Sequence, residues 1–165
     1  MEMNFLILFV AALVPMLIGF LWYGPLFGNA WMQEMNFTKE SLAGQNMIKV
    51  FVLSYIFSLL IAFFLTFIVI HQMGVMQVLQ GETGFGEKTG EAFTFFQDFL
   101  STYGDRFRTF KHGVIHGLMS GFIFVLPIIS IIAMFERKSV KYIAINSGYW
   151  IVTLAIMGGI ICQWV

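Results

Sequence analysis

The three histidines of the chain, His71, His112 and His116, are the residues whose type and spacing suggest chemistry. His112 and His116 are four residues apart, so on a helix they share one face, and two such imidazoles can bind one metal ion. His71 ends one apolar stretch, whereas the other two begin the next. If these stretches cross a membrane in opposite directions, all three imidazoles reach the same side. The pattern allows a three-imidazole site for zinc or copper, or a haem held by His71 and one of the other two.

Other features argue against a cofactor or a catalytic site. No Asp or Glu lies within either apolar stretch as a further ligand, and imidazoles near a membrane surface commonly just bond to lipid phosphate or water. No Ser, Cys or carboxylate pair stands beside a histidine in a catalytic pattern, and no phosphate-loop spacing occurs. The single cysteine, Cys162, excludes an internal disulfide. We therefore expect no enzyme activity and no cofactor, with a metal or haem as the alternative.

The elements that must position the histidines are membrane helices. The chain is 59% hydrophobic and 11% charged, with a mean hydropathy of +0.84, whereas soluble domains carry roughly a quarter charged residues. Its formal net charge of zero gives no reason to expect a nucleic-acid partner. Four uncharged apolar runs are long enough to cross a hydrocarbon core of about 30 Å: Phe5–Tyr23, Val50–Ile70, Gly113–Phe135 and Tyr142–Val165.

These runs predict an all-α, polytopic membrane protein of one domain over residues 1–165, with four transmembrane helices and short interfacial amphipathic helices. Pro15 and Pro127 are expected to bend the first and third spans. Thr38 is a candidate start of a short surface helix, and the second span is expected to continue past His71 towards Leu79.

An extramembrane segment is expected at residues 80–108. Its first part, Gln80–Gly90, is rich in glycine and charge and predicts a solvated loop. The following residues predict an amphipathic helix, with Phe95, Phe96 and Phe99 on one side, that lies on the membrane or caps the bundle.

Small and polar residues mark the expected contacts between helices. Gly113, Gly117 and Gly121 form a doubled GxxxG pattern on one face, which lets another helix approach closely. Asn146 lies near Gly148 in the fourth span, and it is costly in lipid unless hydrogen-bonded, so it is expected to face another helix. The partner helix belongs either to this chain or to another subunit.

An aromatic segment follows the first span and contains Trp22, Tyr23, Gly24, Pro25 and Trp31. Trp and Tyr favour the membrane–water interface, and the Gly-Pro pair is expected to end the helix and turn the chain. Two readings stay open, an interfacial anchor with a turn or an aromatic binding lip.

The basic residues of the turn between the third and fourth spans guide the expected orientation of the protein in the membrane. Arg137, Lys138 and Lys141 cluster between the third and fourth spans, so we expect that turn in the cytoplasm and both termini outside. The turn is a topology determinant or a site for anionic lipid headgroups.

Three pieces of the sequence together resemble a known family. They are GFLWYGPLFGNAWM at residues 19–32, KHGVIHG at 111–117 with Pro127 and FERK following, and INSGYW at 145–150. They are similar to the domain-of-unknown-function family 1761 of small bacterial integral membrane proteins. The resemblance implies a four-span protein of a bacterial cytoplasmic membrane and no particular activity.

Three functions remain open. The packing glycines and the missing catalytic groups favour a non-catalytic accessory or scaffold subunit, whose partners would be membrane lipids and other membrane helices in a homo- or hetero-oligomer. The second is a metal- or haem-binding membrane protein that uses His71, His112 and His116. The third is a homo-oligomeric carrier of small molecules or ions, although the spans lack the buried acidic residues typical of proton-coupled pumps.

Overall fold

The computed structural model describes residues 3–38, 40–42 and 44–165. Within these ranges the regular structure is helical and contains no strand. Four helical segments are long and apolar enough to cross a membrane: Phe5–Leu26, Met47–Val69, Phe110–Phe135 and Val140–Trp164. The all-α fold class and the four predicted spans are therefore confirmed.

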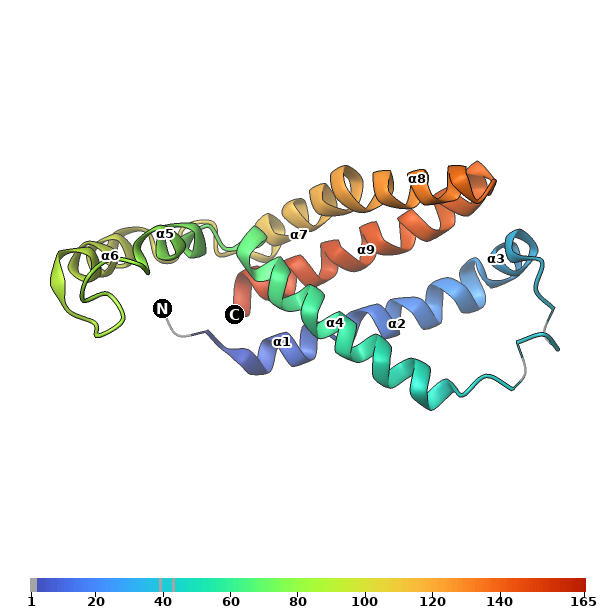
Figure 1. Cartoon of the computed structure of the whole chain (residues 1–165), viewed down its shortest axis with the longest axis horizontal. Helices are drawn as coiled ribbons and strands as arrows, with labels where there is room; N and C mark the ends of the chain where they lie inside the picture. The colour runs from blue at the N-terminus through green and yellow to red at the C-terminus, as the bar shows by residue number, and fades with distance from the viewer. Residues whose placement is uncertain (1–2, 39, 43) are drawn as a thin grey trace.

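The elements follow one another without a sheet (Figure 1). In chain order they are α1 (Phe5–Ala11), α2 (Val14–Leu21), a π-helical turn η1 (Trp22–Leu26), α3 (Gly28–Met35), α4 (Met47–Val69), α5 (Gln72–Leu79), α6 (Gly90–Tyr103), α7 (Phe110–Met119), a π-helical turn η2 (Ser120–Val125), α8 (Leu126–Phe135) and α9 (Val140–Trp164).

Three of the spans begin earlier than their apolar runs because polar caps precede them. The side chains of Asn46, Thr109 and Ser139 each accept a hydrogen bond from the backbone N–H three residues ahead. Such caps satisfy one of the unpaired donors at a helix start. Each helix therefore includes a lysine in its first turn, where the charge lies near the end of the span.

The first span is bent at its proline and kinked at its glycine. Helical hydrogen bonding is interrupted between Ala11 and Val14, one turn before Pro15, which lacks the backbone donor. At Gly24 the backbone leaves helical geometry, with φ −100° and ψ −107°. The chain then turns into α3, as the Gly-Pro pair predicts.

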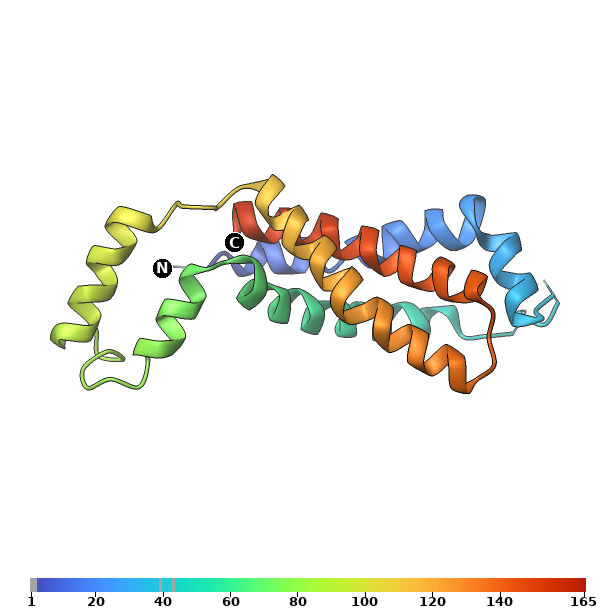
Figure 2. The ribbon, with the colours of Figure 1, turned by 90° about the horizontal axis from the view of Figure 1, so that it is seen from above.

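Helix α9 is the centre of the bundle (Figures 1 and 2). It contacts α1, α2, α4, α7 and α8. In the most apolar 18-residue stretch of each span, 56% is buried for α9, against 28%, 28% and 11% for the first, second and third spans. Its residues Met157, Ile161 and Cys162 are fully buried in the core, together with Leu65 and Ile70 of the second span region. The other spans are ordered mainly by their contact with α9.

The glycines of the third span lie directly against α9. A Cβ atom at Gly113 would overlap the carbonyl oxygen of Gly158, and one at Gly117 would overlap that of Leu154. At Gly121 it would lie 2.7 Å from Ile151 Cα. The two backbones therefore touch along this line, and the partner of the glycine face is a helix of the same chain.

Three local expectations differ from the structure. The second span does not continue into α5, because Ile70 adopts an extended conformation (φ −108°, ψ 99°) and breaks the helix before His71. Phe95 is exposed, whereas Phe96 is buried, so α6 presents only part of its expected apolar face inward. The short helix expected after Thr38 falls partly outside the described residues; Glu40, Ser41 and Leu42 form turns.

The hairpin of α5 and α6 projects beyond one end of the bundle (Figures 1 and 2). One alternative drawn from the sequence, that the amphipathic helix caps the bundle, is therefore wrong. The start of α1 and the end of α9 lie at the same end, where Asn4 N donates to Val165 O at 3.3 Å. The histidines lie where the hairpin joins the spans.

Candidate metal centre

The three histidines come from two chain segments that meet at this end of the bundle. The break at Ile70 places His71 immediately before α5. His112 and His116 lie one turn apart on α7, next to the glycines that face α9. One ligand atom from each imidazole lies within 4.8 Å of the other two. The antiparallel arrangement of the spans therefore brings the histidines together.

The imidazoles are in direct contact with one another. The Nε2 atoms of His71 and His112 are 2.9 Å apart. The ring centroids are 4.9 Å apart for His71 and His112, 4.9 Å for His71 and His116, and 4.5 Å for His112 and His116. A hydrogen bond between two Nε2 atoms needs one donor and one acceptor, so at least one of these two rings is neutral in this arrangement.

The contact between His71 and His112 has nearly the separation of two ligands in a metal site. In a tetrahedral zinc site, Zn–N distances of about 2.0–2.1 Å put two ligand nitrogens about 3.3 Å apart. The 2.9 Å contact between His71 and His112 is only a few tenths of an ångström shorter. The three ligand atoms as a set lie within 4.8 Å of one another, so an ion bound by all three requires side-chain rotations that bring them closer together.

A haem does not fit between the same rings. Two axial histidines bind the iron from opposite faces of a flat macrocycle, and the touching Nε2 atoms of His71 and His112 leave no space for it. The donor set of three imidazoles instead suits Zn²⁺, Cu²⁺ or Ni²⁺.

An aromatic ring covers one side of the histidines. Phe107 stacks on His112, with centroids 5.0 Å apart and an angle of 24° between the planes, and it meets His71 edge-on at 5.8 Å. The backbone of Phe107 is left-handed, with φ 64°. A bulky residue in this conformation is strained, so surrounding contacts must hold the connection between α6 and α7, residues 104–109, in place.

Several hydrogen bonds attach this connection to the bundle. Arg108 Nε donates to Cys162 O at 2.7 Å, and Cys162 Sγ lies 3.3 Å from the carbonyl oxygens of both Val69 and Phe107. Burial lowers the pKa of the Arg108 guanidinium below its ordinary value, although an arginine remains charged at neutral pH. The single cysteine thus acts in packing beside the connection.

The aromatic segment of the first span contacts α9 near the opposite end of the bundle. Trp22 Nε1 donates to Ile145 O at 2.9 Å, and its ring lies against Gly148, where a Cβ atom would be 2.9 Å away. Tyr23 Oη donates to Asn146 Oδ1 at 2.9 Å. Asn146 therefore faces another helix, and two of the distinctive sequence pieces are in contact with each other.

Further rings extend this contact. Trp31, in α3, meets the edge of Tyr23 at 5.5 Å, because the turn at Gly24 and Pro25 folds α3 back. Tyr149 lies 5.1 Å from Tyr23 and donates its hydroxyl to Pro15 O at 2.8 Å. The aromatic segment thus packs within the protein on at least one side, in addition to its expected interfacial position.

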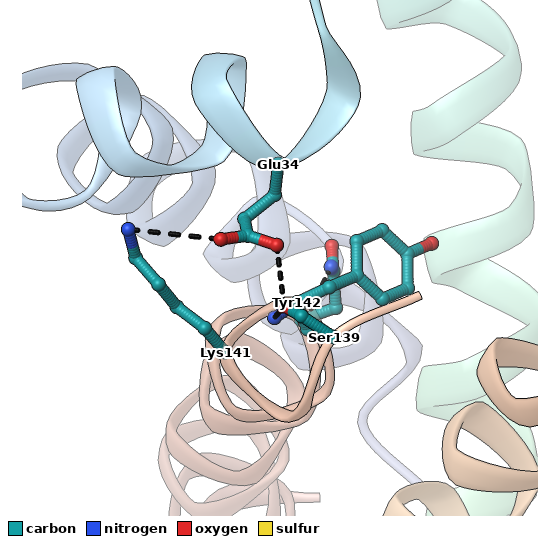
Figure 3. Close-up of polar contacts among 5 residues, drawn as sticks. Glu34, Ser139, Lys141 and Tyr142 are labelled. Atoms are coloured by element: carbon teal, nitrogen blue, oxygen red, sulfur yellow. Dashed lines mark hydrogen bonds and ion pairs between the residues drawn. The ribbon is translucent and has the colours of Figure 1, made fainter. Parts of the chain in front are cut away.

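Sequence reasoning did not identify one charged contact at this end. Glu34 of α3 accepts a hydrogen bond from Ser139 Oγ and lies 3.7 Å from Lys141 Nζ (Figure 3). These groups join α3 to the first turn of α9. The pairing depends on the kink at Gly24, so the spacing of these residues in the sequence does not indicate it.

We predict that Tyr23→Phe lowers stability by about 1 kcal/mol, since membrane-helix hydrogen bonds contribute about that much. The loss of the hydroxyl leaves Asn146 Oδ1 without this donor. Thermal unfolding in a mild detergent should show a midpoint lower by about 2–4 °C. Tyr103→Phe, in an exposed ring, serves as the control.

The double variant Tyr23→Phe/Asn146→Leu checks the cause of that loss. Replacing both partners by apolar groups avoids an unpaired polar atom, so the double variant should be less destabilised than the sum of the single variants. An additive result would show that the two side chains do not interact.

The fold and the clustered histidines define a four-helix membrane protein with a candidate metal centre at one end. Residues 6–162 match the family described as "Protein of unknown function (DUF1761)", which covers nearly the whole chain, and the protein belongs to this family. No curated protein and no solved structure matches the sequence.

Proposed function

We propose that this membrane protein binds one divalent transition-metal ion, such as Zn²⁺, through His71, His112 and His116. The observation that carries the proposal is the convergence of three imidazoles from two separate segments, with ligand atoms within 4.8 Å of one another.

The donor set suggests how such an ion would be held. Three neutral nitrogens leave one position open in a tetrahedral site, which is typical of sites that exchange water or another ligand. His71 is exposed, and the other two imidazoles are half-buried. An ion would therefore be reached from the end of the bundle that carries the α5–α6 hairpin, and we propose that the site receives or presents its metal there.

The scaffold hypothesis has less support from the geometry. Its main argument was the glycine pattern, and those glycines lie against α9 of the same chain, so that face is not available to another protein. A homo-oligomeric carrier has no specific observation in its favour. Contacts with lipids or other membrane helices, a bacterial cytoplasmic membrane and the lack of enzyme activity stay predictions.

Metal analysis of the purified protein tests the proposal. The full chain would be extracted in a mild detergent, its metals removed with a chelator, and Co²⁺ or Zn²⁺ added back. We expect about one ion per chain and visible bands of four-coordinate cobalt, as a tetrahedral site predicts. Failure to bind either ion in stoichiometric amount would refute the proposal, and a Soret band in the purified protein would favour haem instead.

A further inference from the structure

A cleft of about 490 Å³ opens between three membrane spans, at the end of the bundle away from the histidines. One wall is α2, the other is the first half of α4, and Tyr149 and Trp150 of α9 line the cleft between them. The cleft exists because α4 crosses α1 and α2 and then diverges from α2 towards its own start (Figure 1). Three lining rings are more than half exposed, so the cleft opens sideways into lipid: Phe20, Phe51 and Phe57.

The cleft has the depth of one leaflet of a bilayer. Along α4 its lining extends from Val50 to Ile61, which at a rise of 1.5 Å per residue is about 17 Å. Half of a hydrocarbon core of about 30 Å is about 15 Å. The whole helix is Met47–Val69, so Ile61 lies near the middle of the span. The cleft therefore runs from the membrane surface to the midplane, which is the depth that one acyl chain occupies.

The aromatic segment forms the shallow end of the cleft. Tyr23 and Gly24 line it there, and the kink at Gly24 turns the chain into α3, which contacts α9 rather than continuing along α4. A Cβ atom at Gly24 would have no neighbour within 4 Å, so this end is open. Tyr and Trp rings favour the membrane surface. Of the two readings of this segment, the arrangement favours the binding lip.

The polar groups in the lining indicate the chemistry of the occupant. Among the described residues, none of those that line the cleft is charged. The hydroxyl groups of Tyr23, Ser58 and Tyr149 each donate a hydrogen bond to another group of the protein. The polar side chains that remain in the lining are Ser54 and the indole of Trp150. A polar headgroup inside the cleft would thus lose its water for few partners, whereas a hydrocarbon chain needs none.

We propose that this cleft binds one acyl chain of a membrane phospholipid, from the leaflet on the side of the aromatic segment. The chain lies between α2 and α4 against Tyr149 and Trp150, and the headgroup stays at the membrane surface beside Tyr23 and Gly24. Because the part that is bound is hydrocarbon, the affinity depends little on the headgroup. This inference goes beyond the proposed metal binding and is independent of it, since the histidines lie at the other end of the spans.

Native mass spectrometry of the full chain tests the proposal. The protein would be reconstituted in nanodiscs that contain phosphatidylethanolamine and phosphatidylglycerol with the same acyl chains, and then released into a mild detergent. We expect about one phospholipid retained per protein chain, with both headgroups present in the proportion of the mixture. Retention of no lipid, or of one headgroup only, would overturn the proposal. An isoprenoid lipid in place of the phospholipid, in protein extracted directly from cells, would overturn it as well.

A variant that fills the cleft locates the site. Ser54→Phe places a ring halfway along the cleft and leaves the bond from Ser58 intact, because that bond ends on the backbone oxygen of residue 54. Displacing about two methylenes costs about tenfold in affinity, so phospholipid titrated into the delipidated variant should bind about tenfold more weakly or worse. Ile56→Phe adds the same ring at an exposed position of α4 outside the cleft and should bind like the wild type. Equal affinities of the two variants would contradict the assignment.

A truncation tests the same site without adding bulk. Phe51→Ala removes a ring that lines the cleft, so it should weaken phospholipid binding by about threefold or more through lost contacts. Val52→Ala, at the exposed neighbouring position outside the lining, should not. If Ser54→Phe fails to fold, this pair decides, and equal affinities of Phe51→Ala and Val52→Ala would refute the proposal. Zn²⁺ stoichiometry should be the same in all these variants, so failure of either proposal leaves the other standing.

Discussion

Replacing any one of the three histidines with alanine is expected to lower the affinity for Zn²⁺ by about 100-fold or more. Changes in the residues around a metal's ligands already cost 10–100-fold, and loss of one ligand from a set of three should cost at least as much. All three variants should show the effect, because the ligand atoms of His71, His112 and His116 lie within one 4.8 Å cluster. Competition with a chromophoric chelator measures the affinity.

Two further variants separate loss of a ligand from loss of structure. His112→Cys replaces one zinc ligand with another and should recover part of the affinity that His112→Ala loses. Phe107→Leu keeps all three imidazoles but removes the ring stacked on His112, so its loss should be smaller, about tenfold. Alanine variants that bind Zn²⁺ like the wild type would show that the histidines meet for another reason.

The sequence predicted the general position of the site because membrane topology is simple. A helix that spans a bilayer must lie nearly along one direction, so consecutive spans run antiparallel. Residues at the end of one span and the start of the next then come to the same side. His71 and His112 follow this rule. Their close contact required the break at Ile70, and no Gly or Pro in Val69–Met73 indicates a break there.

The contacts between helices were predictable only in part. Small residues indicate a face where another backbone comes close, but they do not identify the neighbour. Gly158 and Gly159 in the fourth span are small residues of this kind, and Gly158 lies against Gly113. The hydrogen bonds that the buried Gln72 side chain donates to Tyr103 O and Arg106 O could not be inferred either, because both partners are backbone carbonyl oxygens of residues far along the chain.

The contact between α7 and α9 leads to the second large expected effect. Gly117→Ala should lower the free energy of unfolding by about 3 kcal/mol or more, at the upper end of overpacking costs. The new Cβ atom would overlap the carbonyl oxygen of Leu154 and would lie 2.7 Å from Ala155 Cα. Both are backbone atoms, so neither can rotate away, and the helices must separate. Equilibrium unfolding in mixed detergent micelles measures the change.

Gly19→Ala is the matched control within another membrane span. There the added Cβ would lie 3.6 Å from Tyr149 Oη, an ordinary contact, and alanine is favoured over glycine in a helix by about 1 kcal/mol. This variant should therefore be as stable as the wild type or more stable. Similar stabilities for the two variants would contradict the close packing of α7 on α9. Since His116 directly precedes Gly117, separation of these helices should also move its imidazole, so Gly117→Ala is expected to weaken Zn²⁺ binding whereas Gly19→Ala is not.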